Sequence, residues 1–338
     1  KDMIKVSFEN PEDCPRFVAG IVKNVKVGPS PDWLRHKLEL AGQRSINNVV
    51  DISNFVLLEM GQPSHIFDYD TIESKEILIR RATKGEKIKT LDEESRKLTP
   101  DELLITNGTK PIAIAGIMGG LSTSVNDKSS TLLIECAYFN PPVIRKGAKN
   151  LGMSTEASKR FERGADPNGT EKAMWRIIQL LEDIANGEWV PGIVDPYPKK
   201  IKQGLIKLSR LKLDILSGCK IPDKAVKESL VNLGCSVKQT SGEWICTPPS
   251  WRPDLKREID LIEEVVRIYG YDNIPSSLNY EGIMNDQITD PHRSLSKIIN
   301  ILTGFGFNQI FSNSLQSSRK ISALKFNRRY YHIMIGSH

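Results

Sequence analysis

Four carboxylates in the last third of the chain have the spacing of side chains that share one helix face. Asp260, Glu263 and Glu264 lie three and four residues apart, as neighbours on a helix surface do. Asp254 lies about one and a half helical turns before Asp260. Because carboxylates that lie close together repel one another, the pattern indicates a bound cation or a basic partner. A solvated acidic face paired with nearby Lys and Arg residues is the structural alternative.

Two residues in the first half of the chain could take part in acid–base chemistry. Glu135 follows an apolar run over 132–134 that predicts a strand, so its carboxyl is expected at a sheet edge that faces a pocket. His65 lies in a predicted turn. A surface glutamate at a strand end and a structural histidine are the alternatives. No Ser or Cys has a sequence relation to His65 that would indicate a catalytic triad.

A glycine-rich segment and a helix start could form the wall of such a pocket. The glycines of segment 115–120, Gly119 among them, permit a close backbone approach and a positive φ. No Gly-Lys-Ser/Thr sequence follows, so this is not a Walker A loop, although it could be an ordinary turn. Ser154 is expected to cap a helix that begins near Thr155 and Ala157. The free N–H groups of that helix start could hold an ester oxygen or a phosphate, with simple capping as the alternative.

The hydrophobic pattern predicts the elements that position these residues. Alternating apolar residues predict a strand over 16–27, and short apolar runs predict strands over 77–79, 103–105 and 132–134. Ser30 is expected to cap one helix, and Gly61 to end another over 47–60. Further helices are predicted over 141–150, 154–163 and 169–186.

A proline-rich segment over 190–198 indicates a domain boundary. After it, the pattern predicts a strand, helices over 211–217 and 223–234, a strand pair over 235–247 and a helix over 254–270. We therefore expect an α+β fold. Its parts would be a mixed α/β domain over 1–200, a small winged-helix-like α+β domain over 201–276, and a third part, 277–338, that starts with an amphipathic helix.

The composition excludes several classes of protein. Of 338 residues, 39% are hydrophobic and 26% charged, as in an ordinary globular protein. The five cysteines include no C-x-x-C pair, which argues against a zinc site or a disulfide framework and fits a reducing cytoplasm. No apolar run is long enough to span a membrane, and no signal peptide is expected. The net charge of +6 suits a nucleic-acid partner, although a mixed, solvated surface is the more common explanation.

An ordered set of motifs carries a resemblance to a known family. The motifs occupy 44–51 (RSINNVVD), 61–68 (GQPSHIFD), 115–120 (AGIMGG), 135–141 (ECAYFNP), 155–164 (TEASKRFERG), 248–254 (PPSWRPD) and 259–271 (IDLIEEVVRIYGY). In this order they resemble the editing domain and the following domain of the bacterial-type phenylalanyl-tRNA synthetase beta subunit. The resemblance covers roughly residues 10–316. We therefore expect a fragment of such a subunit that carries the site for hydrolysis of mischarged Tyr-tRNA(Phe).

The resemblance implies a role for each candidate residue. Glu135 matches the glutamate that reads the tyrosine hydroxyl, and His65 the histidine that lines the pocket near the ester and the terminal adenosine. Arg44 and Asn54 match other pocket positions, and Arg44 could contact the tRNA end. Since no triad is expected, hydrolysis would use a positioned water without a covalent enzyme intermediate. The remaining expected wall residues are Gly119, Thr155 and Ala157, the last of them small enough to leave room for an aromatic ring.

The resemblance also implies a metal and partners. Asp254, Asp260, Glu263 and Glu264 match a Mg²⁺ site shared with the alpha subunit, some of them through water. The whole enzyme would be an alpha2-beta2 heterotetramer in the cytoplasm that acts on tRNA(Phe) and uses ATP, which this chain alone is not expected to bind. The isolated chain would be at most an aminoacyl-tRNA ester hydrolase, because in this family the alpha subunit holds the synthetic site.

Two alternatives to this interpretation stay open. One is a freestanding deacylase that edits in trans, against which the second domain argues, because such an enzyme needs no subunit-docking module. The other is a non-catalytic tRNA-binding fragment. The family's N-terminal tRNA-binding module and C-terminal parts have no counterpart in this sequence. The resemblance implies that the third part, 277–338, contains the start of the family's catalytic-like core. From about Ser317 the sequence no longer resembles the family and is expected to be a foreign or frameshifted tail.

Overall fold

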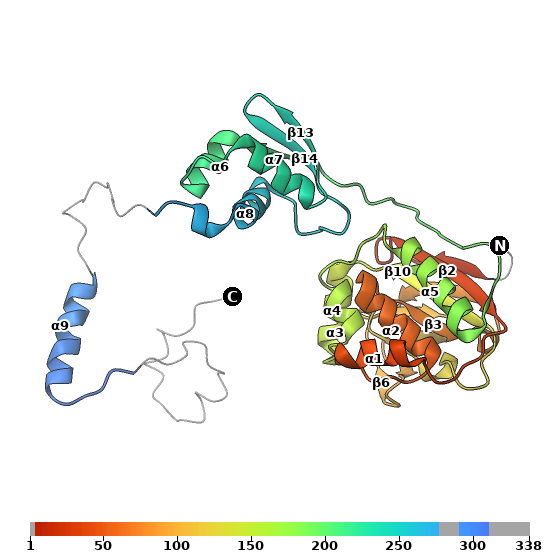
Figure 1. Ribbon diagram of the computed structural model, residues 1–338. Helices are drawn as coiled ribbons and strands as arrows, with labels where there is room; N and C mark the ends of the chain where they lie inside the picture. Colours follow the sequence, from red (N-terminus) through yellow and green to blue (C-terminus); the bar gives the residue numbers. More distant parts are fainter. Residues whose placement is uncertain (1–3, 277–290, 311–338) are drawn as a thin grey trace. The chain divides into compact units, whose positions relative to one another are not determined.

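The computed structural model describes residues 4–276 and 291–310. The chain divides into two compact units, Lys1–Pro275 and Ser276–His338. The first unit contains the two predicted domains, and α9 (Pro291–Gly304) is the described helix of the second (Figure 1). This helix confirms the amphipathic segment predicted there. The expected foreign tail after Ser317 lies outside the described residues, and the three-part division of the chain stays a prediction.

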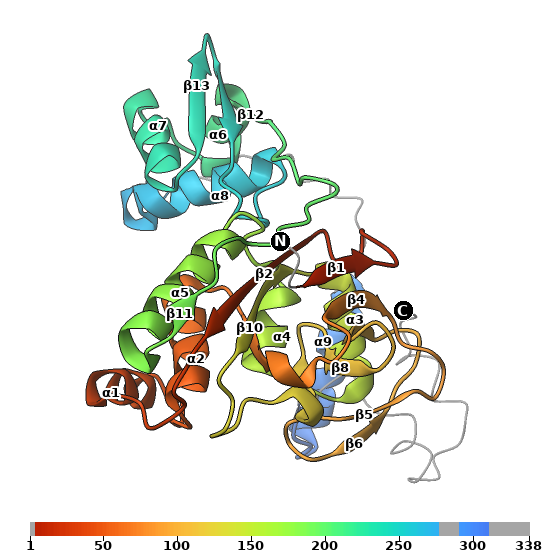
Figure 2. The same ribbon diagram turned by 90° about the vertical axis from the view of Figure 1, so that its right-hand side faces the viewer.

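An antiparallel sheet forms the centre of the first domain. Its strand order is β11 (Glu188–Trp189), β2 (Arg16–Lys23), β10 (Leu132–Tyr138) and β3 (His65–Asp68). Helices α2 (Asn48–Met60) and α5 (Thr170–Ala185) cover one face, and α1 (Asp32–Leu40) packs on α2 (Figure 2). Both predicted central strands and the three helices are therefore present.

A second, five-stranded sheet lies on the other side of β10. Its order is β1 (Lys5–Phe8), β4 (Glu76–Arg81), β7 (Leu103–Thr106), β8 (Pro111–Ile114) and β9 (Met118–Gly119). The hairpin of β5 (Lys87–Lys89) and β6 (Ser95–Lys97) lies between β4 and β7 in sequence. Helices α3 (Pro141–Leu151) and α4 (Glu156–Phe161) follow β10, and the short helices η1 (Tyr69–Thr71) and η2 (Leu121–Thr123) connect strands. The helices and sheets together confirm the predicted α+β class.

The alternation of side chains along β10 decides which way Glu135 points. Ile134 and Cys136 pack in the core under the helices, whereas Leu133 and Ala137 pack in the core shared with the five-stranded sheet. Because successive strand residues point to opposite faces, Glu135 belongs with Leu133 and Ala137. Its carboxyl therefore points between the two sheets.

Two predicted helix caps are wrong. The N-cap of α1 is Pro31, whereas the hydroxyl of Ser30 donates to Asp51 Oδ2 at 2.5 Å. The N-cap of α4 is Thr155 rather than Ser154. Gly61 ends α2 with a φ of 70°, as predicted.

The second domain has a separate hydrophobic core around the buried side chain of Trp244. Its sheet has the order β12 (Ile206–Ser209), β14 (Glu243–Thr247), β13 (Ser236–Thr240). Helices α6 (Arg210–Ser217), α7 (Asp223–Asn232) and α8 (Glu258–Tyr269) complete it, and η3 (Tyr271–Asn273) follows α8. The predicted helix over 254–270 begins four residues late, so Asp254 lies in the preceding loop and not on α8.

Within residues 4–276 and 291–310, no helix has both the length and the apolar character that crossing a bilayer requires.

Candidate functional site

A cavity of about 240 Å³ opens between the two sheets and α4 of the first domain. Strands β3, β9 and β10 and helices α2 and α4 each contribute residues to its wall. Most of the residues singled out in the sequence meet there, although they come from segments up to about a hundred positions apart. The predicted residues that line the cavity are Asn54, His65, Gly119, Glu135, Thr155 and Ala157.

Glu135 lies in the middle of a sheet, which corrects the prediction of a sheet edge. It pairs with Ala19 of β2 on one side and with His65 of β3 on the other. Its side chain is 4% exposed, and its Oε2 has no hydrogen-bond partner among the described residues. Burial raises the pKa of the carboxyl to about 8, because desolvation penalises the charged form. Glu135 is therefore largely a neutral acid at pH 7.

His65 lies beside Glu135 on the same face of the sheet, because the two residues are directly opposite one another in an antiparallel pair. Its Nε2 is buried and also has no partner within the described chain. Burial lowers the pKa of the imidazole to about 4, so the ring is neutral at pH 7. Two polar atoms without partners thus face one cavity, which indicates that a ligand or water satisfies them.

Gly119 is small because the ring of His65 occupies the place of a side chain. A Cβ at position 119 would lie 2.3 Å from Cε1 and 2.6 Å from Nε2 of His65. Gly119 therefore lies in the cavity wall as predicted, because the imidazole packs directly against its Cα. Any larger residue at this position would displace the ring of His65.

Helix α4 is joined to the cavity wall by Thr155. The hydroxyl of Thr155 donates to Ile117 O at 2.9 Å and accepts from Ser158 N at 3.0 Å. Ser158 Oγ in turn accepts from Thr155 N at 2.9 Å, which completes a capping box. The hydroxyl of Thr155 therefore positions α4 and has no free role in the cavity. Ala157 is half-buried and lines the cavity together with Glu156 and Phe161 of the same helix, and it is the smallest of the three.

Arg44 does not join this site. It is exposed in the loop between α1 and α2 and is absent from the cavity wall. Sequence reasoning missed Ser53 and Leu57, which lie one residue before and three residues after Asn54 on α2. Helical spacing from Asn54 could have found Leu57. The hydroxyl of Ser53 is 2.9 Å from that of Ser64, so the two satisfy each other.

Nucleophilic catalysis by a cysteine finds no support near the cavity. Cys14 and Cys136 are fully buried, and burial raises the pKa of both thiols well above the usual range. Thiolates are the reactive form, so neither group is poised to attack an ester.

The four carboxylates of the predicted metal site are held largely by arginines. Arg252 binds Asp254 at 2.6 Å and Glu264 at 3.0 Å. Asp260 accepts from backbone N–H groups at the start of α8, and Glu263 is exposed. Within the described ranges, no cluster of three or more His, Cys, Asp or Glu has a metal-binding arrangement. The observed contacts match the acidic-face alternative, and the Mg²⁺ site stays a prediction.

The raised pKa of Glu135 predicts a stability that falls as the pH rises. The folded state holds the proton up to about pH 8, whereas the unfolded state releases it near the usual value of 4.5. Between pH 7 and 8, where His65 is largely neutral in both the folded and the unfolded state, the free energy of unfolding should fall by about 1 kcal/mol. Glu135→Gln should remove this slope. Urea unfolding at both pH values measures it, with the exposed Glu39→Gln as a control that keeps the wild-type slope.

Comparison with known proteins identifies the families to which the two domains belong. The B3/4 domain family matches residues 13–186, and the tRNA synthetase B5 domain family matches residues 206–271. The chain therefore belongs to the B3/4 domain family, with a B5 domain after it.

The relatives narrow the assignment to one kind of subunit. The phenylalanine–tRNA ligase beta subunit of Syntrophus aciditrophicus is 44% identical over 317 residues, which are 92% of this chain and 39% of the relative. The beta subunit of Bacillus licheniformis is 42% identical over 333 residues, covering 98% of this chain and 41% of the relative. The chain thus matches a fragment of such beta subunits and spans about two fifths of their length, which confirms the resemblance predicted from the motifs.

One solved structure is also similar, with low sequence identity. An N-terminal fragment of the phenylalanyl-tRNA synthetase beta subunit from Pyrococcus horikoshii has 16% sequence identity and a TM-score of 0.38, over 80% of this chain and 76% of that chain.

Proposed function

We propose that the cavity hydrolyses the ester of tyrosine wrongly attached to tRNA(Phe). The observation that carries this proposal is the unpartnered carboxyl oxygen of Glu135, buried in a cavity beside the unpartnered Nε2 of His65. A phenol hydroxyl that enters the cavity would give Glu135 a hydrogen-bond partner. A phenylalanine ring would displace water and leave the carboxyl unpaired, at a cost of about 1–3 kcal/mol.

A synthetase for phenylalanine has a physical need for such a site. Tyrosine differs from phenylalanine by one hydroxyl, and a hydrophobic pocket rejects an added hydroxyl only by about a hundredfold. A second site that prefers the hydroxylated side chain removes the remaining errors. The buried Glu135 supplies this preference, because a site with an unpaired polar group favours the ligand that pairs with it.

The chemistry needs an attacking water rather than an enzyme nucleophile. Water adds to the ester carbonyl, the bond to the ribose oxygen breaks, and a proton passes to the departing ribose hydroxyl. The neutral imidazole of His65 can hold the water or the ribose by a hydrogen bond from or to Nε2. With a pKa of about 4 it is a weak base, so positioning is its main contribution. A hydroxyl of the terminal ribose can assist the proton transfer.

The whole protein of which this chain is a part would join an alpha subunit as an alpha2-beta2 heterotetramer in the cytoplasm. That enzyme would attach phenylalanine to tRNA(Phe) with ATP and Mg²⁺. The similarity to phenylalanine–tRNA ligase beta subunits over most of this chain supports this assignment.

One assay tests the cavity's function directly. The purified chain is incubated with Tyr-tRNA(Phe) and, separately, with Phe-tRNA(Phe), and the release of the free amino acid is followed. We expect faster hydrolysis of the tyrosyl ester. Binding of tRNA without hydrolysis of either ester would instead identify a non-catalytic fragment. Hydrolysis in trans with no affinity for an alpha subunit would identify a freestanding deacylase.

Substitution of Glu263 tests the proposed Mg²⁺ site without removing a side chain that holds the fold together. This carboxylate is exposed, whereas Glu264 is held by Arg252 and Arg267 and its loss would leave two arginines without a partner. Glu263→Ala should weaken Mg²⁺-dependent association with a cognate alpha subunit by about tenfold and leave both domains folded. Association is measured by titration at several Mg²⁺ concentrations, with the exposed Glu228→Ala on α7 as control. Equal affinities of both variants at every Mg²⁺ level would remove the metal from this face.

A further inference from the structure

We propose that a basic groove next to the cavity binds the phosphate backbone of the tRNA acceptor end. This lysine groove has a volume of about 530 Å³ and is separate from the cavity described above. The residues that define it are Lys87 and Lys89 of β5, Lys110 before β8, and Thr123 of η2. The proposal deepens the proposed function, on which its choice of RNA as the ligand rests.

The lysines carry an excess of unneutralised positive charge. None of the three ammonium groups has an ion-pair or hydrogen-bond partner among the residues that the structure describes. Glu73 is the acidic residue of the lining, so the groove has a net charge of +2. Uncompensated cations that surround a hollow attract phosphate groups, the most common ligand for such an arrangement in nucleic-acid-binding proteins.

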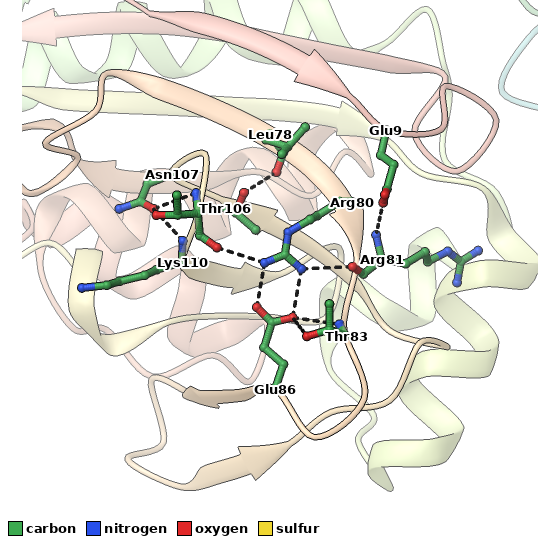
Figure 3. Close-up of polar contacts among 10 residues, drawn as sticks. Glu9, Leu78, Arg80, Arg81, Thr83, Glu86, Thr106, Asn107 and Lys110 are labelled. Atoms are coloured by element: carbon green, nitrogen blue, oxygen red, sulfur yellow. Dashed lines mark hydrogen bonds and ion pairs between the residues drawn. The ribbon is translucent and has the colours of Figure 1, made fainter.

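An ion pair fixes the lysine-bearing segments relative to one another (Figure 3). Arg80 of β4 donates to both carboxylate oxygens of Glu86, at 2.9 and 2.7 Å, and to the carbonyl of Thr109 at 3.0 Å. Glu86 and Thr109 immediately precede Lys87 and Lys110. The hydrogen bonds from Arg80 lower the pKa of Glu86 to about 2, so the pair persists at any physiological pH. The backbone segments next to Lys87 and Lys110 are therefore held in place relative to each other.

The turn that carries Lys110 is fixed in the same way. Asn107 Oδ1 accepts from the backbone N–H of Lys110 at 2.9 Å, while the ammonium of Lys110 makes no contact with the residues drawn in Figure 3. The backbone is thus held in place and the charge is left available.

Thr123 gives the groove a second, independent sign of a ligand. It is 2% exposed, lines the groove, and its Oγ1 has no hydrogen-bond partner within the described chain. Buried hydroxyls are rarely left unpaired. A phosphate oxygen accepts hydrogen bonds from a hydroxyl and from ammonium groups, so phosphates bound in the groove are suited to pair with the lysines and with Thr123.

The position of the groove indicates that its phosphate belongs to the substrate of the cavity. Thr90 and Gly120 form a β-bridge. Leu91 and Gly119, on one side of this bridge, line the cavity, whereas Lys89, on its other side, lines the groove. One residue pair therefore separates the two hollows. A polynucleotide whose 3′ end enters the cavity would bring its backbone phosphates to the lysines.

The test separates RNA binding from ester chemistry. Lys87→Gln, Lys89→Gln and Lys110→Gln are combined, and the affinity for uncharged tRNA(Phe) is measured between about 0.05 and 0.5 M salt. We expect the slope of log affinity against log salt to fall by about 2, and affinity near 0.1 M salt to fall by about a hundredfold. Hydrolysis of the small ester tyrosyl-adenosine, which has no backbone phosphate, should stay within about twofold of the wild type.

Two further variants make the result specific. Lys149→Gln, Lys172→Gln and Lys227→Gln remove the same charge from exposed positions of α3, α5 and α7 and should leave most of the affinity intact. Thr123→Val removes the hydroxyl without a charge, so it should weaken binding severalfold with an unchanged salt slope.

Each outcome decides one question. If the groove and control triple variants lose equal affinity, only net charge matters and the groove is no site. If inorganic phosphate binds the wild type while the groove variant retains its affinity for tRNA, the groove holds a free anion instead. If the wild type fails to hydrolyse Tyr-tRNA(Phe), the proposed function is wrong, and the tRNA affinities still decide the role of the groove.

Discussion

Glu135→Ala is expected to lower the preference for the tyrosyl ester over the phenylalanyl ester by roughly five- to a hundredfold. The carboxyl is buried and its Oε2 has no hydrogen-bond partner among the described residues, so the phenol hydroxyl would be its partner. The expected size is the cost of about 1–3 kcal/mol for a buried polar group without a hydrogen bond, at about 1.4 kcal/mol per factor of ten. The measurement is the ratio of hydrolysis rates of Tyr-tRNA(Phe) and Phe-tRNA(Phe).

The same ratio distinguishes a reader of the phenol from a general base. If Glu135 only reads the phenol, hydrolysis of the phenylalanyl ester changes little or rises, because no unpaired carboxyl remains. If it activates the water, both esters slow by the same factor, about a hundredfold or more. Glu135→Gln is the matched control, since an amide can still pair with a phenol and should keep most of the preference. Equal loss on both esters would refute the reader role.

Ala157→Trp is expected to reduce hydrolysis of Tyr-tRNA(Phe) by at least about a hundredfold. Ala157 lines a cavity of about 240 Å³, and an indole at this position would occupy the space that the tyrosine ring needs. A misplacement of about 1 Å at a reacting centre already costs about a hundredfold, so exclusion of the ring should cost at least as much. Hydrolysis is measured at saturating substrate, together with far-UV circular dichroism to verify the fold.

Lys159→Trp is the control for a tryptophan in α4. Lys159 is exposed and does not line the cavity. Its ion-pair partner Glu156 does line it, and Glu156 keeps Arg160 as a second partner in this variant. This variant should retain nearly full activity. A folded Ala157→Trp variant that hydrolyses the tyrosyl ester at the wild-type rate would show that the ring binds elsewhere.

Local sequence signals predicted most of the elements because they depend on near neighbours. The apolar period of α5, the glycine after α2 and the short apolar runs of β4, β7 and β10 are properties of a few consecutive residues. Helix starts were less reliable. Thr155 rather than Ser154 caps α4, because Thr155 lies three residues before Ser158 and the two exchange side-chain-to-backbone hydrogen bonds. Helix α8 starts at Glu258, four residues after Asp254.

The sequence by itself determined the family and the types of residue in the site, because the order and the residue types of the motifs can be read without a structure. Only the tertiary structure decided that Glu135 lies in a central strand opposite His65. It also decided that the imidazole of His65 packs against Gly119, and that Arg44 lies outside the cavity. These facts depend on strand pairing between segments far apart in the chain, which no local pattern encodes. Burial follows from the same pairing. Burial raises the pKa of Glu135 and lowers that of His65, so that both side chains are largely neutral at pH 7. The sequence alone does not show this property of the candidate site.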